Sequence, residues 1–472
     1  MVKLINIGKV KPKSAKLITD SRLGIGFEKL DRGAFDPEAV YDRVAELGVK
    51  WIRLQSGWKR TEREKNIYDF TWLDEIVDNL ISRGLKPWLC LCYGNDLYDE
   101  FARKYYGAVG CPPIYSDEQK QAWKNYVIAL TNRYKGKIEF YEIWNEPDHV
   151  YMWKKGINAT EYGNFVIETA KIIKSVDTSA KVIGGAIAWL KPQYMIDFFN
   201  TGVAQYIDCL SFHSYHGCDE RWEYTYNTYR SIVDMYNPNI QLIQGEAGAA
   251  SRSDGSGAYS NCEWTESKQA KFLLRHLIYD LSTDNVFTSY FSTVDMIEGT
   301  AGVNGKKETY LDYGYFGVLG AEFDENGVAR KGFYKKPSYY ALQNLASVFD
   351  ENVKTTNILY TFPFNGDYND DIFDFDVSIR DIKSYGFLKS DGSKAIAYYC
   401  PKPLFTTDFS SFTQIYILCN DVSKIKIIDL MDGSIYAIPK ENTEVLNNNY
   451  YKLKNIPIKD YPMLLDLGGF VK

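Results

Sequence analysis

The sequence predicts an α/β protein: a (β/α)8 TIM barrel at residues 21–349, with a C-terminal β-sandwich domain made of residues 1–20 and 350–472. Three observations support this prediction. Between residues 23 and 348, eight apolar strand-like runs alternate with helical stretches, as in a parallel barrel. A glutamate lies at or just beyond the end of two of these runs, at Glu146 and Glu246. After residue 350 the pattern changes to short alternating strands between turn residues, which is typical of a sandwich.

Each barrel strand is expected in an apolar run that ends at a turn residue or at a helix-start signal. The runs occupy residues 23–27, 49–54, 87–93, 140–144, 181–184, 206–213, 240–246 and 286–292. The helices between and after them are expected at residues 37–47, 72–82, 117–134, 160–176, 194–199, 222–236, 265–279 and 337–348. The first helix is predicted to start at Asp36-Pro37, because an N-cap residue followed by proline favours a helix start.

The second domain is expected to be discontinuous. Its strands are predicted at residues 384–388, 394–399, 415–418, 424–429 and 463–467. Turn signals at residues 390–392 and 431–433 separate them. Residues 1–18 are strand-like and precede the barrel repeat, so they are expected to pair with this domain.

Composition excludes several classes of function. The 472 residues carry a net charge of −6, and no basic run favours nucleic acid as a partner. No apolar stretch is long enough for a membrane span. The N-terminus lacks an apolar signal core, so we expect either a cytoplasmic protein or a secreted or periplasmic enzyme whose signal has been removed. Aromatic residues make up 15%, and their faces suit the apolar faces of sugar rings as well as an ordinary core.

No metal and no cofactor are expected. The chain has 4 His, and its 8 Cys form no paired CxxC clusters. Cys90, Cys92 and Cys209 lie within apolar runs and are expected to be core thiols. Cys111, Cys218 and Cys262 are each expected in loops, and the sequence leaves open whether any two of them pair.

Glu146 and Glu246 are the predicted catalytic pair. Glu146 ends the fourth strand, where Asn145 and Pro147 stop the ladder, and so lies at the catalytic face of a parallel barrel. Its apolar neighbours should raise the pKa of its carboxyl toward that of a general acid. Glu246 ends the seventh strand between two nearby glycines, across the barrel mouth from Glu146. A glycosidic bond fits between two such carboxylates.

Four neighbours fit supporting roles. His213 ends the sixth strand, and with Tyr215 it could hold a nucleophilic carboxylate in position; a purely structural histidine is the alternative. Arg53 ends the second strand and would keep that carboxylate ionised, although a buried ion pair would explain it equally well. Asn145 could reach a sugar 2-hydroxyl.

Other strand ends supply further candidates for the pocket. The predicted substrate-binding residues there are Glu28, Trp58, Tyr93 and Asn95. Trp58 and Tyr93 could stack on a sugar or pack within their loops. A second group could bind sugar hydroxyls near the mouth: Asp96, Asp148, His149 and Asp295.

The segment Glu-Ile-Trp-Asn-Glu-Pro at residues 142–147, with residues 66–74, 84–87 and 208–215, resembles the clan A retaining glycoside hydrolases. Family 39, the β-xylosidase and α-L-iduronidase group, is the most similar. The resemblance covers residues 23–348 and implies that Glu146 is the acid/base, Glu246 the nucleophile, and Asn145, His213 and Tyr215 their helpers. Two features depart from the family: Gly-Glu-Ala-Gly at residues 245–248, and Tyr290-Phe291 where a tryptophan is usual.

The predicted function is therefore a retaining glycoside hydrolase that cleaves a plant or microbial saccharide by double displacement and is exo-acting, like β-xylosidases. The carboxyl groups should lie roughly 5–5.5 Å apart. The alternatives are an endo-glycanase of the same clan, a non-catalytic carbohydrate-binding barrel and a metal-dependent hydrolase. Inserts at residues 94–113, 249–263 and 297–336 could wall off a pocket or build a cleft. The sugar, its linkage, the oligomeric state and the role of the sandwich stay open.

Overall fold

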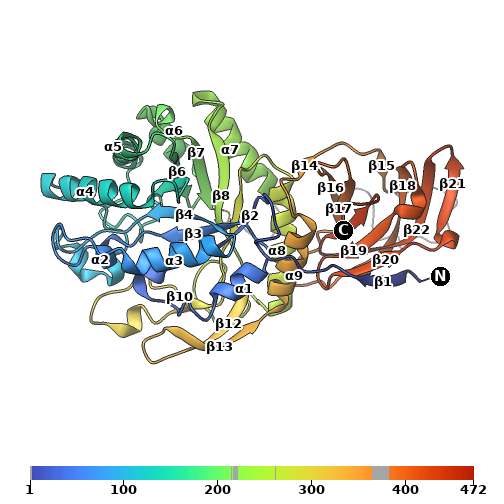
Figure 1. Ribbon diagram of the computed structural model, residues 1–472, viewed down its shortest axis with the longest axis horizontal. Coiled ribbons are helices and arrows are strands. Elements are labelled where there is room, and N and C mark those ends of the chain that lie inside the picture. Colours follow the sequence, from blue (N-terminus) through green and yellow to red (C-terminus); the bar gives the residue numbers. More distant parts are fainter. Residues whose placement is uncertain (1–2, 214, 216–221, 261, 364–381) are drawn as a thin grey trace.

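The computed structural model describes residues 3–213, 215, 222–260, 262–363 and 382–472. Eight parallel strands close into a barrel (Figure 1). The barrel closes where the last strand, β9, pairs with the first, β2. In order around the barrel they are β2 (Leu23–Gly26), β3 (Trp51–Gln55), β4 (Lys86–Leu91), β5 (Phe140–Ile143), β6 (Lys181–Ile187), β7 (Cys209–His213), β8 (Gln241–Ala247) and β9 (Thr288–Tyr290). The predicted fold class is confirmed.

The barrel interior changes character along its axis. An apolar cluster fills the end where the strands begin, with contributions from Trp51, Trp88, Phe140, Ile183, Cys209, Ile243 and Phe287. Two residues further along, the strands place charged groups inside, because side chains on the same face of a strand recur every second residue. Arg53 and Glu142, on strands that are not neighbours, meet across this interior. The chemistry is therefore concentrated at the carboxyl ends of the strands.

Helices surround the barrel, and a short additional one, α2, follows β3. Their bounds are α1 (Tyr41–Glu46), α2 (Trp58–Thr61), α3 (Thr71–Ser82), α4 (Asp117–Tyr134), α5 (Ala159–Val176), α6 (Pro192–Asn200), α7 (Trp222–Tyr236), α8 (Glu266–Leu281) and α9 (Pro337–Val348). The predicted start of the first helix is wrong. Asp36 accepts a bond from the Glu38 N–H, but residues 37–40 form a turn, and α1 begins at Tyr41.

The second domain contains two antiparallel sheets. The seven-stranded sheet has the order β1 (Ile5–Lys9), β20 (Ser434–Ala437), β19 (Lys426–Asp429), β23 (Met463–Asp466), β17 (Lys394–Tyr399), β16 (Lys383–Leu388) and β14 (Lys354–Thr355). The four-stranded sheet has the order β15 (Tyr360–Thr361), β18 (Ser410–Leu418), β22 (Tyr450–Lys459) and β21 (Thr443–Asn447). Since β1 pairs with β20, the start of the chain lies in this domain. The boundaries at residues 20 and 350 stay a prediction.

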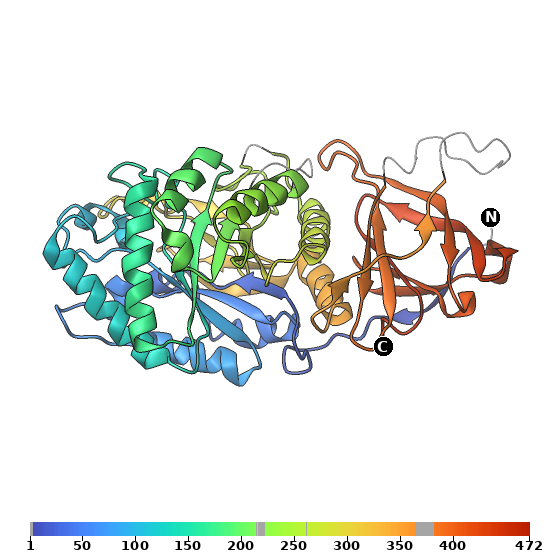
Figure 2. The same cartoon turned by 90° about the horizontal axis from the view of Figure 1, so that it is seen from above.

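The sandwich packs against the side of the barrel through α8 and α9, which lie between the two domains (Figure 2). Lys271 of α8 forms a buried salt bridge of 2.7 Å with Asp460. Arg275, one turn further along α8, donates to the Lys402 carbonyl at 3.0 Å. Trp264 meets Phe405 edge to face, with ring centroids 4.8 Å apart. These contacts support a packing role for the sandwich.

The insert after β9 folds into two small hairpins. The strand β10 (Met296–Ile297) pairs with β11 (Tyr313–Gly314), and β12 (Leu319–Phe323) pairs with β13 (Ala329–Lys335). Among the described residues, no helix has the length and apolar character needed to cross a membrane. Cys90, Cys92 and Cys209 are buried thiols, as predicted, and Cys111 and Cys262 are both free. Cys218 lies outside the described residues.

Candidate active site

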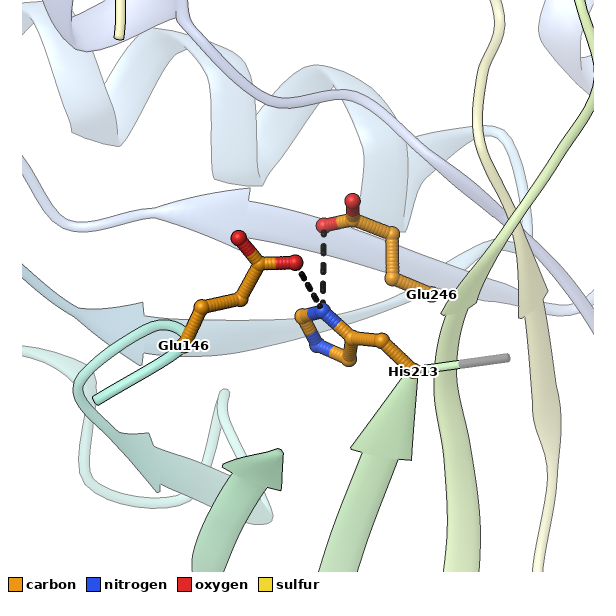
Figure 3. Close-up of side chains that lie close together, drawn as sticks. All are labelled: Glu146, His213 and Glu246. Atoms are coloured by element: carbon orange, nitrogen blue, oxygen red, sulfur yellow. Dashed lines mark hydrogen bonds and ion pairs between the residues drawn. The ribbon is translucent and has the colours of Figure 1, made fainter. Parts of the chain in front are cut away.

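Glu146 and Glu246 face each other at the barrel mouth, with His213 between them (Figure 3). The His213 Nδ1 lies 2.9 Å from Glu146 Oε1 and 3.9 Å from Glu246 Oε2. One oxygen of each carboxylate and this nitrogen all lie within 4.8 Å of one another. The two carboxylates can therefore act on the same small group of atoms.

Glu146 projects from a tight bend that begins directly after β5. Trp144 and Glu146 have φ values of 70° and 47°, in the left-handed region that costs a non-glycine residue about 1–3 kcal/mol. The bend is held because the Glu146 N–H donates to the Ala186 carbonyl at 3.0 Å and the Trp144 N–H donates to the Leu91 carbonyl at 3.1 Å. The Trp144 indole also donates to the Met152 carbonyl at 2.8 Å. The strained backbone at this bend is thus held in place by hydrogen bonds, which fixes the position of the Glu146 carboxylate.

Glu246 is carried by β8 itself, and the glycines beside it allow β8 to approach its neighbours closely. A Cβ atom at Gly245 would lie 2.1 Å from the Ser211 Oγ. A Cβ atom at Gly248 would lie 1.9 Å from the Phe291 carbonyl oxygen. Any larger residue at either position would displace the strand that holds Glu246.

Arg53 is fully buried beneath the two carboxylates and is surrounded by acceptors. Its guanidinium donates to Glu246 Oε2 at 2.7 Å, to Glu142 Oε2 at 3.0 and 2.5 Å, and to Asn145 Oδ1 at 2.8 Å. A Glu28 oxygen lies 3.5 Å away. A buried guanidinium is stable only when it is paired in this way, so Arg53 fixes the geometry of several acidic side chains at once.

The two carboxylates differ in their surroundings. Burial raises the pKa of Glu146 to about 7. Burial and the nearby Glu146 also raise the pKa of Glu246, whereas Arg53 and a 3.0 Å hydrogen bond from the Tyr215 hydroxyl oppose part of this rise. Burial lowers the pKa of His213, which favours the neutral imidazole. Glu146 therefore suits an acid, and Glu246 has the partners that an ionised carboxylate requires.

A cavity of about 690 Å³ opens above the pair, and all of its lining residues come from the segment between Glu28 and Phe316. Six of the predicted site residues line it: Glu28, Tyr93, Asn145, Glu146, Tyr215 and Glu246. Arg53 and His213 lie below and contact the two carboxylates directly. Tyr93 has the Arg32 guanidinium 5.3 Å from the centre of its ring, which takes part of the surface expected for a sugar.

Two predicted pocket residues do not line this cavity. Trp58 lies in α2, which turns its side chain away from the mouth, where it stacks on Tyr98 and Tyr126 and donates to Glu62 at 2.6 Å. Asn95 is buried in a turn, where its amide donates to the Glu62 carbonyl at 2.9 Å. Both residues are used for loop packing, the alternative that the sequence left open for Trp58.

His213 also differs from expectation, because it bonds to Glu146 rather than to the predicted nucleophile. Of the four residues suggested as hydroxyl ligands, only His149 lines the cavity. Asp96 and Asp295 form salt bridges with Lys59 and Lys336, at 2.8 and 2.7 Å. Asp148 accepts from the Ala188 and Trp189 backbone N–H groups at 2.8 and 2.9 Å.

Sequence reasoning missed several residues of the site. Glu142 is the nearest partner of Arg53, and a glutamate within an apolar strand was the signal that could have revealed it. Gln55, the last residue of β3, also lines the cavity. The other missed lining residues lie outside the barrel strands and belong to no motif: Lys29, Arg32, Tyr151, Trp189, Tyr259, Glu298 and Asp312.

Glu146, His213 and Glu246 also offer ligand atoms of the kind that hold a metal ion, and these atoms lie close together. The Arg53 guanidinium already supplies a positive charge 2.7 Å from Glu246. A divalent ion bound to Glu246 would face this charge at short range. The arrangement is therefore better suited to proton transfer and nucleophilic attack than to metal chemistry.

Comparisons with known proteins agree with this geometry. A family model described as "Glycosyl hydrolases family 39" matches residues 43–238. A β-xylosidase from Geobacillus stearothermophilus is 27% identical over 167 residues, which cover 32% of this chain and 31% of that protein. The β-galactosidase BgaA from Clostridium cellulovorans is 26% identical over 225 residues, 40% of this chain and 33% of that protein. The chain thus spans about a third of the length of these relatives.

The fold has a solved counterpart. The structure of a family 39 glycoside hydrolase from Bacteroides cellulosilyticus matches with a TM-score of 0.65 at 16% identity, over 97% of this chain and 83% of that one. This match covers the barrel and the sandwich together, whereas the family model covers the segment that carries Glu146 and His213. The chain is therefore similar to the family 39 glycoside hydrolases, in sequence over residues 43–238 and in fold over both domains.

Proposed function

We propose that this protein is a retaining, exo-acting O-glycosyl hydrolase that removes a sugar from the non-reducing end of a saccharide. The observation that carries the proposal is the close approach of Glu146 and Glu246. One carboxylate oxygen of Glu146 lies within 4.8 Å of one carboxylate oxygen of Glu246. In a retaining enzyme both carboxylates act on one glycosidic bond, one on its oxygen and one on the anomeric carbon. Two carboxylate oxygens this close can both reach the atoms of one bond, which supports direct attack by one of the carboxylates.

The proposed reaction has two steps. Glu146 gives its proton to the glycosidic oxygen while Glu246 attacks the anomeric carbon, which forms a glycosyl ester and releases the leaving alcohol. Glu146, now ionised, removes a proton from water, which attacks the same carbon and frees Glu246. Each residue thus ends the cycle in its starting protonation state.

Neighbouring groups support these roles. Arg53 and Tyr215 donate to Glu246 at 2.7 and 3.0 Å, so they favour its ionised form before attack. The Asn145 Oδ1 already accepts from Arg53, so its amide nitrogen is the atom that would bind a sugar hydroxyl. That bond would strengthen as charge develops on the sugar ring in the transition state.

Exo-action is supported by the shape of the cavity. Its deep end is formed by side chains of low exposure, with Glu28 at 1%, Phe316 at 2% and Gln55 at 6%. Its rim includes Tyr151 and Trp189, which are 45% and 44% exposed. A site with one closed end accepts a terminal sugar. The relatives act on β-xylosides and β-galactosides by name, and these are the first glycones to test.

The test is nitrophenol release from a panel of aryl β- and α-glycosides, with xylosides and galactosides included. We expect turnover of one glycone, lost in Glu246→Ala, reduced in Glu146→Ala and retained in Glu168→Ala, whose carboxylate is 70% exposed on α5. Absence of turnover across the panel would overturn exo-action on a single sugar. Full activity in Glu246→Ala would overturn the catalytic pair.

A further inference from the structure

We infer that Trp189, His149 and Tyr151 form a subsite for the leaving group, which binds a second sugar ring of the substrate. These three residues, called here the rim platform, all line the same cavity as Glu146 and Glu246. The inference rests on the proposed function and extends it, because it names a saccharide rather than a simple alcohol as the leaving group.

The rim platform is an ordered set of rings. Trp189 stacks on His149, with ring centroids 6.3 Å apart and an interplanar angle of 16°. The Tyr151 ring lies 5.4 Å from the same imidazole. Although Trp is usually among the more buried residue types, Trp189 is 44% exposed. A large apolar ring held open at the mouth of a polar cavity fits the apolar C–H face of a sugar.

The rim platform is tied to the acid by the backbone. The His149 N–H donates to the Glu146 carbonyl at 3.0 Å, and the Glu146 N–H donates to the Ala186 carbonyl at 3.0 Å. Buried Asp148 accepts from the Trp189 N–H at 2.9 Å, and Lys191 donates to the Asp148 carbonyl at 3.0 Å. The loop after β6 is thereby fixed to the bend that carries Glu146, and Trp189 keeps a constant position relative to the proton donor.

The barrel order assigns the rim platform to the leaving-group side. Trp189 follows β6, which lies four strands from β2 in the closed eight-stranded barrel, so Trp189 and Glu28 stand on opposite sides of the mouth. Glu28 lies 3.5 Å from Arg53, the residue that holds Glu246, and belongs to the closed end. The leaving oxygen takes its proton from Glu146, so the group attached to it extends toward β5 and β6, where the rim platform lies.

The test compares substrates that share a glycone and differ in the leaving group. The probes are the glycosyl fluoride and the disaccharide of the sugar that the aryl panel identifies, which are β-D-xylosyl fluoride and xylobiose where that sugar is xylose. Fluoride has no ring to stack. We expect Trp189→Ala to lower kcat/KM for the disaccharide about 10–100-fold, the effect of losing one buried apolar ring contact, and to leave the fluoride within about twofold.

Two further variants complete the test. Trp189→Phe should recover most of the activity on the disaccharide, because it keeps an aromatic face. Phe412→Ala removes a similarly exposed ring, 48% exposed on β18 of the sandwich, and should change neither substrate. Equal losses on fluoride and disaccharide in Trp189→Ala, or no loss on either, would overturn the subsite. Wild-type inactivity on the fluoride would instead contradict the proposed function.

Discussion

The strand ends that carry Glu146 and Glu246 have equivalent positions in the barrel but different surroundings. At the end of β8, Glu246 meets a buried guanidinium at 2.7 Å and a phenol at 3.0 Å. Beyond the end of β5, Glu146 meets an imidazole at 2.9 Å that burial keeps neutral, since burial lowers the pKa of His213. The comparison teaches that neighbours, rather than position in the fold, distinguish the proposed acid from the proposed nucleophile.

The largest expected effect is the loss of the nucleophile. Glu246→Ala should lower kcat on aryl glycosides about 10⁴–10⁶-fold, the order seen when a covalent nucleophile is removed. Added azide should restore turnover by attacking from the vacated face, which gives a glycosyl azide of inverted configuration. Proton NMR of the product measures this configuration, and an azide product of retained configuration in Glu246→Ala would contradict the assignment.

Loss of the acid should depend on the leaving group. Glu146→Ala should lower kcat/KM about 10²–10⁴-fold for glycosides of poorly acidic alcohols, which need protonation to depart. Dinitrophenyl glycosides leave without a proton, so their kcat/KM should fall far less. Steady-state rates on a leaving-group series measure the difference. A loss of the same size across the series would show that Glu146 is not the proton donor.

The pH profile should separate the two carboxylates. The pKa of Glu146 is raised to about 7, so the acid holds its proton below that pH and loses it above. We expect kcat/KM to fall about tenfold for each pH unit above 7, because the protonated fraction falls in that proportion. This limb should vanish in Glu146→Ala assayed on a dinitrophenyl glycoside. A limb that persists in that variant would belong to another group.

A smaller effect is expected at Tyr215. Its hydroxyl donates to Glu246 and lowers the pKa of that carboxyl, so Tyr215→Phe should raise this pKa and move the acidic limb of kcat/KM to higher pH. A hydrogen bond to a charged group contributes about 1.5–3 kcal/mol, which corresponds to a loss of about 10–100-fold at neutral pH. Tyr224→Phe, on an exposed side chain of α7, is the control. An acidic limb in the same place as in the wild type would refute the role.

The smallest expected effect is on stability, at Glu28. Burial raises the pKa of Glu28 from its ordinary 4.5 to about 8, so between these pH values the folded protein keeps a proton that the unfolded chain has lost. The free energy of unfolding therefore falls as pH rises through this window. Glu28→Gln mimics the protonated carboxyl and should flatten this fall, by a few kcal/mol at most. Urea unfolding at pH 5 and pH 8 measures it. An equal change in the free energy of unfolding between pH 5 and pH 8 in wild type and variant would contradict the raised pKa of Glu28.

The sequence placed the strands and the two strand-end glutamates more accurately than the walls of the cavity. Apolar runs that stop at a polar or proline residue mark the ends of buried strands, so Glu146, Glu246 and Arg53 could be placed at one face of the barrel. Trp58 was misplaced because its direction depends on the four-residue helix α2, which has too few residues to give a periodic signal.

The loops carry the part that sequence reasoning missed. Trp189 is fixed by Asp148 from the preceding loop, and Glu298 lies next to the short strand β10. Contacts between loops that are distant in the sequence leave no local pattern. The sequence also showed no sign that His213 bonds to Glu146 rather than to Glu246. The choice depends on a difference of about 1 Å, because the His213 Nδ1 lies 2.9 Å from Glu146 and 3.9 Å from Glu246.

The most direct test of the contrast between Glu246 as nucleophile and Glu146 as acid is to trap the covalent intermediate. Incubation with the dinitrophenyl 2-deoxy-2-fluoro glycoside of the preferred sugar should inactivate the enzyme and add one fluoroglycosyl group per chain. The fluorine slows both steps, and the good leaving group lets the ester accumulate. Mass spectrometry of the peptides should locate the adduct on Glu246. An adduct on Glu146, or release of a product of inverted configuration without an adduct, would contradict the assignment of nucleophile and acid.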